Sequence, residues 1–258
     1  RLESKKNLVL TGPPGVGKTF FARRLAWILN GSSAADDSRI EFLQFHQSYA
    51  YEDFVRGYRP TKDGGFELKD GPFLRFCQEA RNEPDDQFVL VIDEINRGNL
   101  SRIFGELLML IEKDKRSEAY AVSLAYPRED EAKFFVPENV HIIGTMNTAD
   151  RSLAMVDYAL RRRFAFVDLR PKFKDGKFKK HLQGQGVSGT LANHIIDSFT
   201  KLNQQIEDSS DLGRGFCIGH SYFCPEIPLG DGIELGQENQ DPSGDSPGSW
   251  ADEVYRVI

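Results

Sequence analysis

An eight-residue segment combines three glycines with a lysine and a threonine, the residue types that hold the phosphates of a nucleotide. It reads Gly12-Pro13-Pro14-Gly15-Val16-Gly17-Lys18-Thr19 and has the spacing of a phosphate-binding loop. Glycines let the backbone curl until successive N–H groups face an anion. Lys18 would contact the outer phosphates, and the Thr19 hydroxyl would be a ligand of Mg²⁺. The segment predicts a nucleoside triphosphate site.

Two adjacent carboxylates, Asp93 and Glu94, follow the most apolar run of the chain, Phe88–Ile92. In open α/β sheets the ligand binds beyond the carboxyl ends of the strands, so this pair is expected to face the phosphate loop. Asp93 would hold Mg²⁺ directly or through water, and Glu94 would polarise the water that attacks the phosphate. The two motifs together predict hydrolysis of a nucleoside triphosphate.

Further polar groups follow in the second half of the chain. Asn147 comes shortly after the apolar run Val140–Gly144, where a neutral amide could orient the lytic water or contact the γ-phosphate. Three consecutive arginines, Arg161 to Arg163, precede another apolar run. At a subunit edge, Arg162 or Arg163 could stabilise negative charge on the nucleotide of a neighbouring copy. A solvated basic helix end is the alternative interpretation of the same three residues.

The elements that must position these groups alternate between strand and helix patterns. The strands are expected at Asn7–Thr11, Arg39–Phe45, Phe88–Ile92, Val140–Gly144 and Phe164–Leu169. The helices are expected at Lys18–Leu29, Pro72–Arg81, Leu100–Glu112 and Ser152–Leu160. This order predicts an α/β fold, a five-stranded parallel sheet sandwiched by helices.

Other segments depart from this alternation. Ala121–Tyr126 and Lys133–Val136 suggest a β-hairpin inserted into the α/β core. Lys172–Lys180 is interpreted as a basic connector, with DNA phosphate contact as the less favoured alternative, and Leu191–Glu207 as an amphipathic helix. We therefore expect a nucleotide-binding subdomain over residues 1–170 and a small, mostly helical lid over 171–258, with 225–250 a loop or disordered segment.

The motifs in this order resemble the AAA+ superfamily of ring-forming P-loop NTPases, with Asn147 in the sensor-1 position and the triple arginine in the finger position. Longer segments are similar to the McrB family, the GTP-dependent motor subunits of modified-cytosine restriction systems. They are FHQSYAYEDF at 45–54, GYRP at 57–60, DEINR at 93–97, MNTADRS at 146–152, GRGF at 213–216 and IGHSYF at 218–223. MNTADRS is the most specific of them.

The resemblance implies properties that spacing does not predict. They are GTP rather than ATP as substrate, a hexameric ring that powers DNA translocation, and stimulation by a separate McrC-like nuclease subunit. It also implies that Arg151 takes part in that stimulation and that His220 lies on a lid face near the nucleotide. Family members carry a DNA-reading domain before the motor, so we expect an isolated motor fragment. The segment after Pro225 does not resemble the family's helical lid, which we expect to be truncated.

The composition and charge of the chain indicate which kinds of protein it can be. The 258 residues have a net charge of −6 and 40% hydrophobic residues, as in an ordinary globular chain. Residues 226–258 contain eight acids and one base, so the preceding part is close to neutral and remains compatible with DNA. Three cysteines favour a reducing cytoplasm over a disulfide framework. The chain lacks an apolar stretch of about 18 residues, so we expect no membrane span.

Two other functions remain open. A MoxR-like AAA+ ATPase acting as a chaperone shares the DEINR pattern, and a preference for ATP over GTP would favour it. A nucleotide-gated scaffold would bind the nucleotide without turnover, although Glu94 and Asn147 argue against this. Measurement of phosphate release with each nucleotide separates the three functions.

Overall fold

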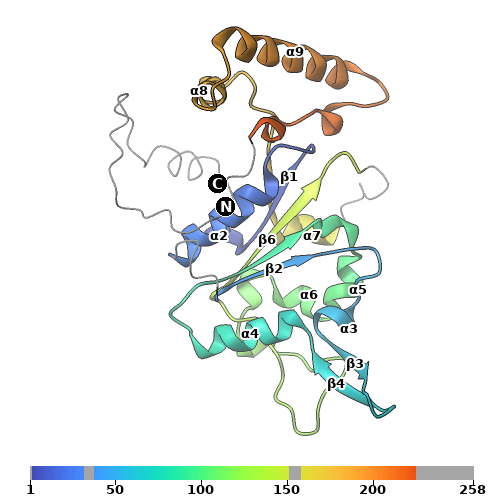
Figure 1. The fold of residues 1–258 in the computed structure, drawn as a ribbon. Helices are drawn as coiled ribbons and strands as arrows, with labels where there is room; N and C mark the ends of the chain where they lie inside the picture. The colour runs from blue at the N-terminus through green and yellow to red at the C-terminus, as the bar shows by residue number, and fades with distance from the viewer. Residues whose placement is uncertain (1, 32–37, 151–157, 225–258) are drawn as a thin grey trace.

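The centre of the molecule is a parallel sheet that ends beneath a helical lid. The computed structural model describes residues 2–31, 38–150 and 158–224. Its five strands lie in the order β2-β5-β6-β1-β7, and every neighbouring pair is parallel (Figure 1). The strands are β1 (Asn7–Gly12), β2 (Ile40–Gln44), β5 (Phe88–Asp93), β6 (Val140–Asn147) and β7 (Ala165–Asp168). The predicted five-stranded parallel sheet is confirmed.

Alternate side chains of the central strands pack into two separate cores. Leu8 and Leu10 of β1 pack with Leu25 of helix α2 (Lys18–Asn30) on one face of the sheet. Val9 belongs to the core on the other face, with residues of helices α4 (Pro72–Asn82), α5 (Leu100–Phe104) and α6 (Leu107–Leu110). Because β1 is buried along its whole length, its middle residues Leu8–Leu10 are apolar without alternation, as expected for a parallel strand covered on both sides.

The remaining helices of the α/β part are short, apart from α4. Their bounds are α1 (Leu2–Lys5), α3 (Tyr51–Phe54), α4 (Pro72–Asn82), α5 (Leu100–Phe104), α6 (Leu107–Leu110) and α7 (Tyr158–Arg163). Single 3-10 turns are η1 (Ile95–Arg97), η2 (Lys113–Lys115) and η3 (Glu118–Tyr120). The described residues contain no helix with the length and apolar character needed to cross a membrane.

Two sequence predictions about this part were wrong in detail, and a third is tested only at its end. The single helix expected at Leu100–Glu112 is divided into α5 and α6, because Gly105 has a positive φ of 52° that ends α5. The hairpin expected at 121–136 contracts to one antiparallel bridge between Val122 and Phe134. The expected helix from Ser152 falls partly outside the described residues, and α7 continues through the arginines to Arg163.

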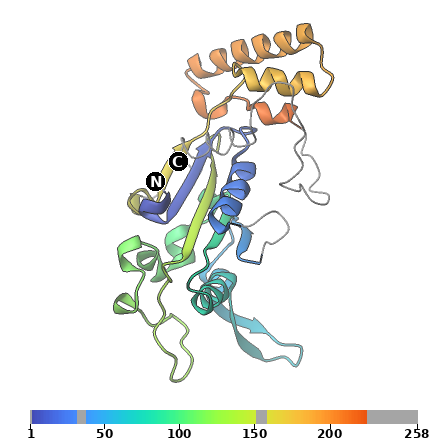
Figure 2. The same cartoon turned by 90° about the vertical axis from the view of Figure 1, so that its left-hand side faces the viewer.

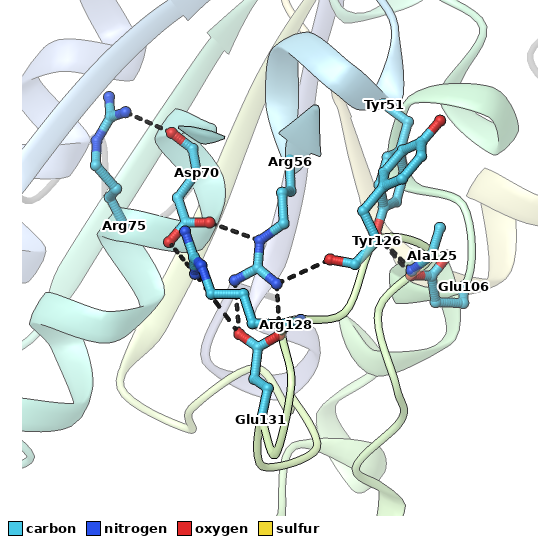
Figure 3. A network of polar contacts seen from close by, with 9 residues as sticks. All are labelled: Tyr51, Arg56, Asp70, Arg75, Glu106, Ala125, Tyr126, Arg128 and Glu131. Atoms are coloured by element: carbon cyan, nitrogen blue, oxygen red, sulfur yellow. Dashed lines mark hydrogen bonds and ion pairs between the residues drawn. The ribbon is translucent and has the colours of Figure 1, made fainter. Parts of the chain in front are cut away.

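A two-stranded hairpin that the sequence did not predict extends from the side of the sheet away from the lid (Figures 1 and 2). It consists of antiparallel strands β3 (Arg56–Pro60) and β4 (Phe66–Asp70). The buried Arg56 side chain fixes its base. The guanidinium donates to Asp70 at 2.6 Å and makes two hydrogen bonds to Glu131 (Figure 3). The hairpin is thereby tied to the segment that carries Tyr126 and Glu131.

The lid forms a third, smaller core at the end of the sheet where β1 ends (Figures 1 and 2). It consists of α8 (Gly176–Gly184), α9 (Gly189–Asp208) and the turns η5 (Arg214–Phe216) and η6 (His220–Phe223). The core contains Phe173, Phe178, Leu182 and Ala192. The interpretation of Lys172–Lys180 as a connector was wrong for residues 176–180, which begin α8. Phe178 and Leu182 are four residues apart and give this helix an apolar face.

Candidate functional site

The phosphate loop joins β1 to α2 and has the torsion angles that its glycines permit. Gly12, Gly15 and Gly17 have φ values of 153°, 74° and 84°. These angles are costly for residues with a Cβ. A Cβ at Gly12 would also lie 2.4 Å from the Leu169 carbonyl oxygen. The strand, loop and helix have the order that a phosphate-binding loop requires.

Lys18, the first residue of α2, points back over the loop. Its Nζ donates to the carbonyl oxygens of Gly12 and Pro13, both at 2.9 Å. Burial lowers the pKa of Lys18, while the charges of Glu94 and Asp93 act in the opposite direction. The ammonium is therefore held at the loop, on the side that the two carboxylates also face.

Asp93, at the end of β5, lies beside Thr19. The Thr19 hydroxyl donates to Asp93 Oδ1 at 3.1 Å. Thr145 on the neighbouring strand β6 also donates to Asp93 Oδ1. Thr19 and Asp93 thus present a hydroxyl and a carboxylate oxygen side by side, which are the hard donors that suit Mg²⁺. Sequence reasoning missed Thr145, although its position two residues before Asn147 at a strand end was visible.

Glu94 has an unusual backbone for a residue with a side chain. Its φ and ψ are 51° and 46°, in the left-handed region, and its N–H donates to Thr145 Oγ1 at 3.2 Å. Backbone strain of this kind is found most often at functional sites. The carboxylate Oε2 is buried and lies 3.5 Å from Arg97 Nε. Arg97 Nη2 in turn lies 3.4 Å from Asp150, so one arginine connects Glu94 to the segment after β6.

Asn147 ends β6 directly beside the start of the phosphate loop. It pairs in register with Gly12, and Thr148 N–H donates to the Gly12 carbonyl at 3.2 Å. The Asn147 side chain accepts the N–H of Ala149 through Oδ1 at 3.1 Å. The sheet therefore brings Asn147, Lys18 and Asp93 to one edge, although they are far apart in sequence.

The arginines at the end of α7 have two different environments. Arg163 is buried, with 7% of its side chain exposed, and its Nε lies 2.9 Å from Glu112 Oε1. Arg162 is 62% exposed and also lies 3.1 Å from that carboxylate. The sequence offered Arg162 and Arg163 as equal candidates for contact with a neighbouring copy, and their burial distinguishes them. Arg151 lies outside the described residues.

The lid contacts the phosphate loop through backbone groups around His220. Gly219 N–H donates to the Pro14 carbonyl at 2.9 Å, and Ser221 N–H donates to the Gly15 carbonyl at 2.8 Å. The His220 ring itself packs in the lid against Phe173 and Phe178, and Nδ1 accepts the Lys172 N–H at 3.2 Å. Burial lowers the pKa of His220. His220 therefore lies near the loop, with its ring directed into the lid core.

A parallel sheet with a phosphate loop, an acidic strand end and a helical lid defines a P-loop nucleoside triphosphatase of the AAA class. The chain belongs to the family of the AAA domain (dynein-related subfamily), whose model matches residues 7–164. The model of the McrB alpha-helical lid domain matches residues 194–241. This second match extends past Pro225 into the acidic segment, which was expected not to resemble a lid.

The chain is also similar to two restriction-enzyme subunits. The chain is 54% identical over 225 residues to the type IV methyl-directed restriction enzyme EcoKMcrB subunit of Escherichia coli, covering 87% of this chain and 48% of that protein. It is 26% identical over 195 residues to the type II restriction enzyme BsuMI component YdiS of Bacillus subtilis, covering 62% of this chain and 56% of that one. These matches confirm the resemblance to the McrB family.

The chain spans about half the length of these curated relatives. Among solved structures, it resembles a putative ATPase from Cytophaga hutchinsonii with a TM-score of 0.39 and 16% identity, over 78% of this chain and 56% of that one.

Proposed function

We propose that this chain is the GTP-hydrolysing motor of a modified-cytosine-dependent restriction complex. The observation that carries the proposal is the convergence of Lys18, Thr19, Asp93, Glu94 and Asn147 at one edge of the sheet. The identity to the EcoKMcrB subunit and the match to the McrB lid support a restriction system rather than a chaperone.

The proposed chemistry is the transfer of a γ-phosphoryl group to water. Lys18 and the loop N–H groups bind the phosphates, while Thr19 and Asp93 hold the Mg²⁺, which supplies positive charge to the phosphate oxygens when bound. Glu94 accepts a proton from the attacking water, and Asn147 orients that water. The water oxygen forms a bond to the γ-phosphorus, and the bond to the β–γ bridging oxygen breaks.

We further propose that the working unit is a ring, expected to be hexameric, in which a neighbouring copy completes each site. Both arginines lie against Glu112, but Arg162 is 62% exposed and so is suited to contact the nucleotide of the neighbour, whereas Arg163 is buried. Arg151 and the adjacent Asp150, which Arg97 contacts, are proposed to transmit stimulation by a McrC-like nuclease subunit. DNA would be handled by the assembled complex.

The experiment that tests this function compares GTP with ATP. The chain is expected to bind GTP with Mg²⁺ more tightly than ATP and to release phosphate from it. Lys18→Ala is expected to lose binding of both nucleotides, because the loop then lacks its cation. A clear preference for ATP would contradict the motor of a restriction complex and favour the MoxR-like chaperone. Binding without any phosphate release, with or without the nuclease partner, would favour the scaffold.

A further inference from the structure

The lid turn formed by Gly219 and η6 (His220–Phe223) lies directly on the phosphate loop. Two lid N–H groups, those of Gly219 and Ser221, donate to consecutive loop carbonyls, those of Pro14 and Gly15. The Tyr222 ring covers the same part of the loop, since a Cβ on Gly15 would lie 2.3 Å from that ring. Three groups from one short segment thus converge on two loop residues.

The approach of the two backbones is close enough to require glycine on both sides. A Cβ on Gly219 would lie 1.9 Å from the carbonyl carbon and oxygen of Gly15, which are backbone atoms that cannot rotate away. Gly15 itself has a φ of 74°. The lid turn and the loop therefore fit together only because neither carries a side chain at the contact.

The hydrogen bonds have a physical role in the shape of the loop. When a loop curls so that successive N–H groups face an anion, its carbonyl groups are directed outward and need donors of their own. The lid supplies donors to Pro14 and Gly15, the two residues in the middle of the curl. Because both donors are backbone N–H groups, these hydrogen bonds do not depend on the rotamer of any lid side chain.

The turn is also held firmly to the rest of the lid. Asn203 of α9 accepts the Ile218 N–H at 2.7 Å and donates to the Ile218 carbonyl at 2.9 Å. His220 packs in the lid core and accepts the Lys172 N–H. The turn thereby connects the lid core to the phosphate loop.

We infer that Gly219 and Tyr222 are positioning residues that hold the phosphate loop in its phosphate-binding shape. The inference rests on the proposed nucleotide binding and adds that affinity depends on this lid turn. Because coupling between two equilibria is reciprocal, nucleotide binding must in turn stabilise the docked turn.

The test uses the chain as it stands, with a fluorescent GTP analogue and Mg²⁺ as the probe. Gly219→Ala is expected to raise the Kd about tenfold or more, since both lid hydrogen bonds are displaced. Tyr222→Ala is expected to raise the Kd in the same direction, and Tyr222→Phe, which keeps the ring, to restore it. The matched control is Gly184→Ala, because a Cβ at this lid glycine contacts nothing within 4 Å.

Two further readouts separate positioning from a general loss of structure. In steady-state hydrolysis, Gly219→Ala should raise KM for the nucleotide more than it lowers kcat, because Asp93 and Glu94 lie outside the turn. Hydrogen exchange of a peptide spanning 213–224 should slow when the nucleotide is added to the unmodified chain and slow less in Gly219→Ala.

Unchanged Kd in both Gly219→Ala and Tyr222→Ala would overturn the inference while leaving the proposed function intact, provided that Lys18→Ala loses binding. If Gly219→Ala does not fold, Tyr222→Ala decides by the same criterion. A chain that binds no nucleotide at all before any substitution would instead contradict the proposed function.

Discussion

The Thr19 hydroxyl donates a hydrogen bond of 3.1 Å to Asp93 Oδ1 across 74 residues of sequence. Thr19 lies in the first turn of α2, which follows β1, and Asp93 ends the apolar strand β5. The bond exists because the parallel sheet places the ends of β1 and β5 at one edge, with only β6 between them. Two motifs recognised separately in the sequence therefore become one site.

Glu94→Gln is expected to separate binding from hydrolysis. The amide keeps the size of the side chain but cannot accept the proton of the attacking water, so nucleotide affinity should persist while phosphate release falls by about 100-fold or more. Equilibrium binding and phosphate release on the same preparation check this. Turnover equal to that of the unmodified chain would remove Glu94 from water activation.

Arg97→Ala is expected to lower kcat with little change in nucleotide affinity. Arg97 lies 3.5 Å from the buried Glu94 Oε2 and 3.4 Å from Asp150. Its loss therefore leaves the Glu94 carboxylate without its contact to Arg97. Arg102→Ala on α5 is the control, because its guanidinium is not part of this chain of contacts. An affinity loss as large as the kcat loss would contradict a role limited to Glu94.

Arg162→Ala and Arg163→Ala are expected to differ in kind. Arg163 is buried against Glu112, so its removal should lower the melting temperature. Arg162 is 62% exposed, so its removal should leave the melting temperature nearly unchanged and reduce hydrolysis only where copies assemble. Thermal unfolding and phosphate release at low and high protein concentration distinguish the two. A stability loss confined to Arg162→Ala would contradict this assignment.

Arg56→Met is expected to destabilise the fold by about 3 kcal/mol, because it leaves Asp70 and Glu131 without their buried partner. Arg59→Met in the same hairpin is the control. Its guanidinium is 43% exposed and pairs with Asp53, so the change should stay below about 1 kcal/mol. Urea unfolding of both variants measures the difference. Equal effects would show that burial of Arg56 does not determine its contribution.

The same ion pairs predict a loss of stability in acid. Hydrogen bonding from Arg56 lowers the pKa of Glu131 below 4.5, its usual value. Burial raises the pKa of Asp70, but Arg128 and Arg56 outweigh burial, so the net pKa lies below 3.8. Lowered carboxyl pKa values add stability that is fully present above the usual values and is lost as the pH falls through the lower, folded ones. The free energy of unfolding of Arg56→Met should therefore depend less on pH below about 4.5 than that of the unmodified chain.

The sequence by itself determined the parts of this protein that are encoded locally. The phosphate loop follows from glycine torsions and the position of Lys18, and the strands follow from apolar runs. The order of these elements was enough to predict a parallel sheet, and the direction of its strands was enough to bring Asp93 to the loop. The segments that resemble the McrB family likewise needed no coordinates.

Only the tertiary structure decided which distant groups share a contact. Examples are the burial of Arg163 against Glu112, the contact of Arg97 with Asp150, and the contact of Gly219 with the phosphate loop. Each of them depends on parts of the chain whose separation in sequence follows no fixed pattern. The apolar spacing over 100–112 likewise did not show that Gly105 has a positive φ and divides the expected helix into α5 and α6. Spacing reports local geometry, whereas these contacts depend on how packed layers bring separate parts of the chain together.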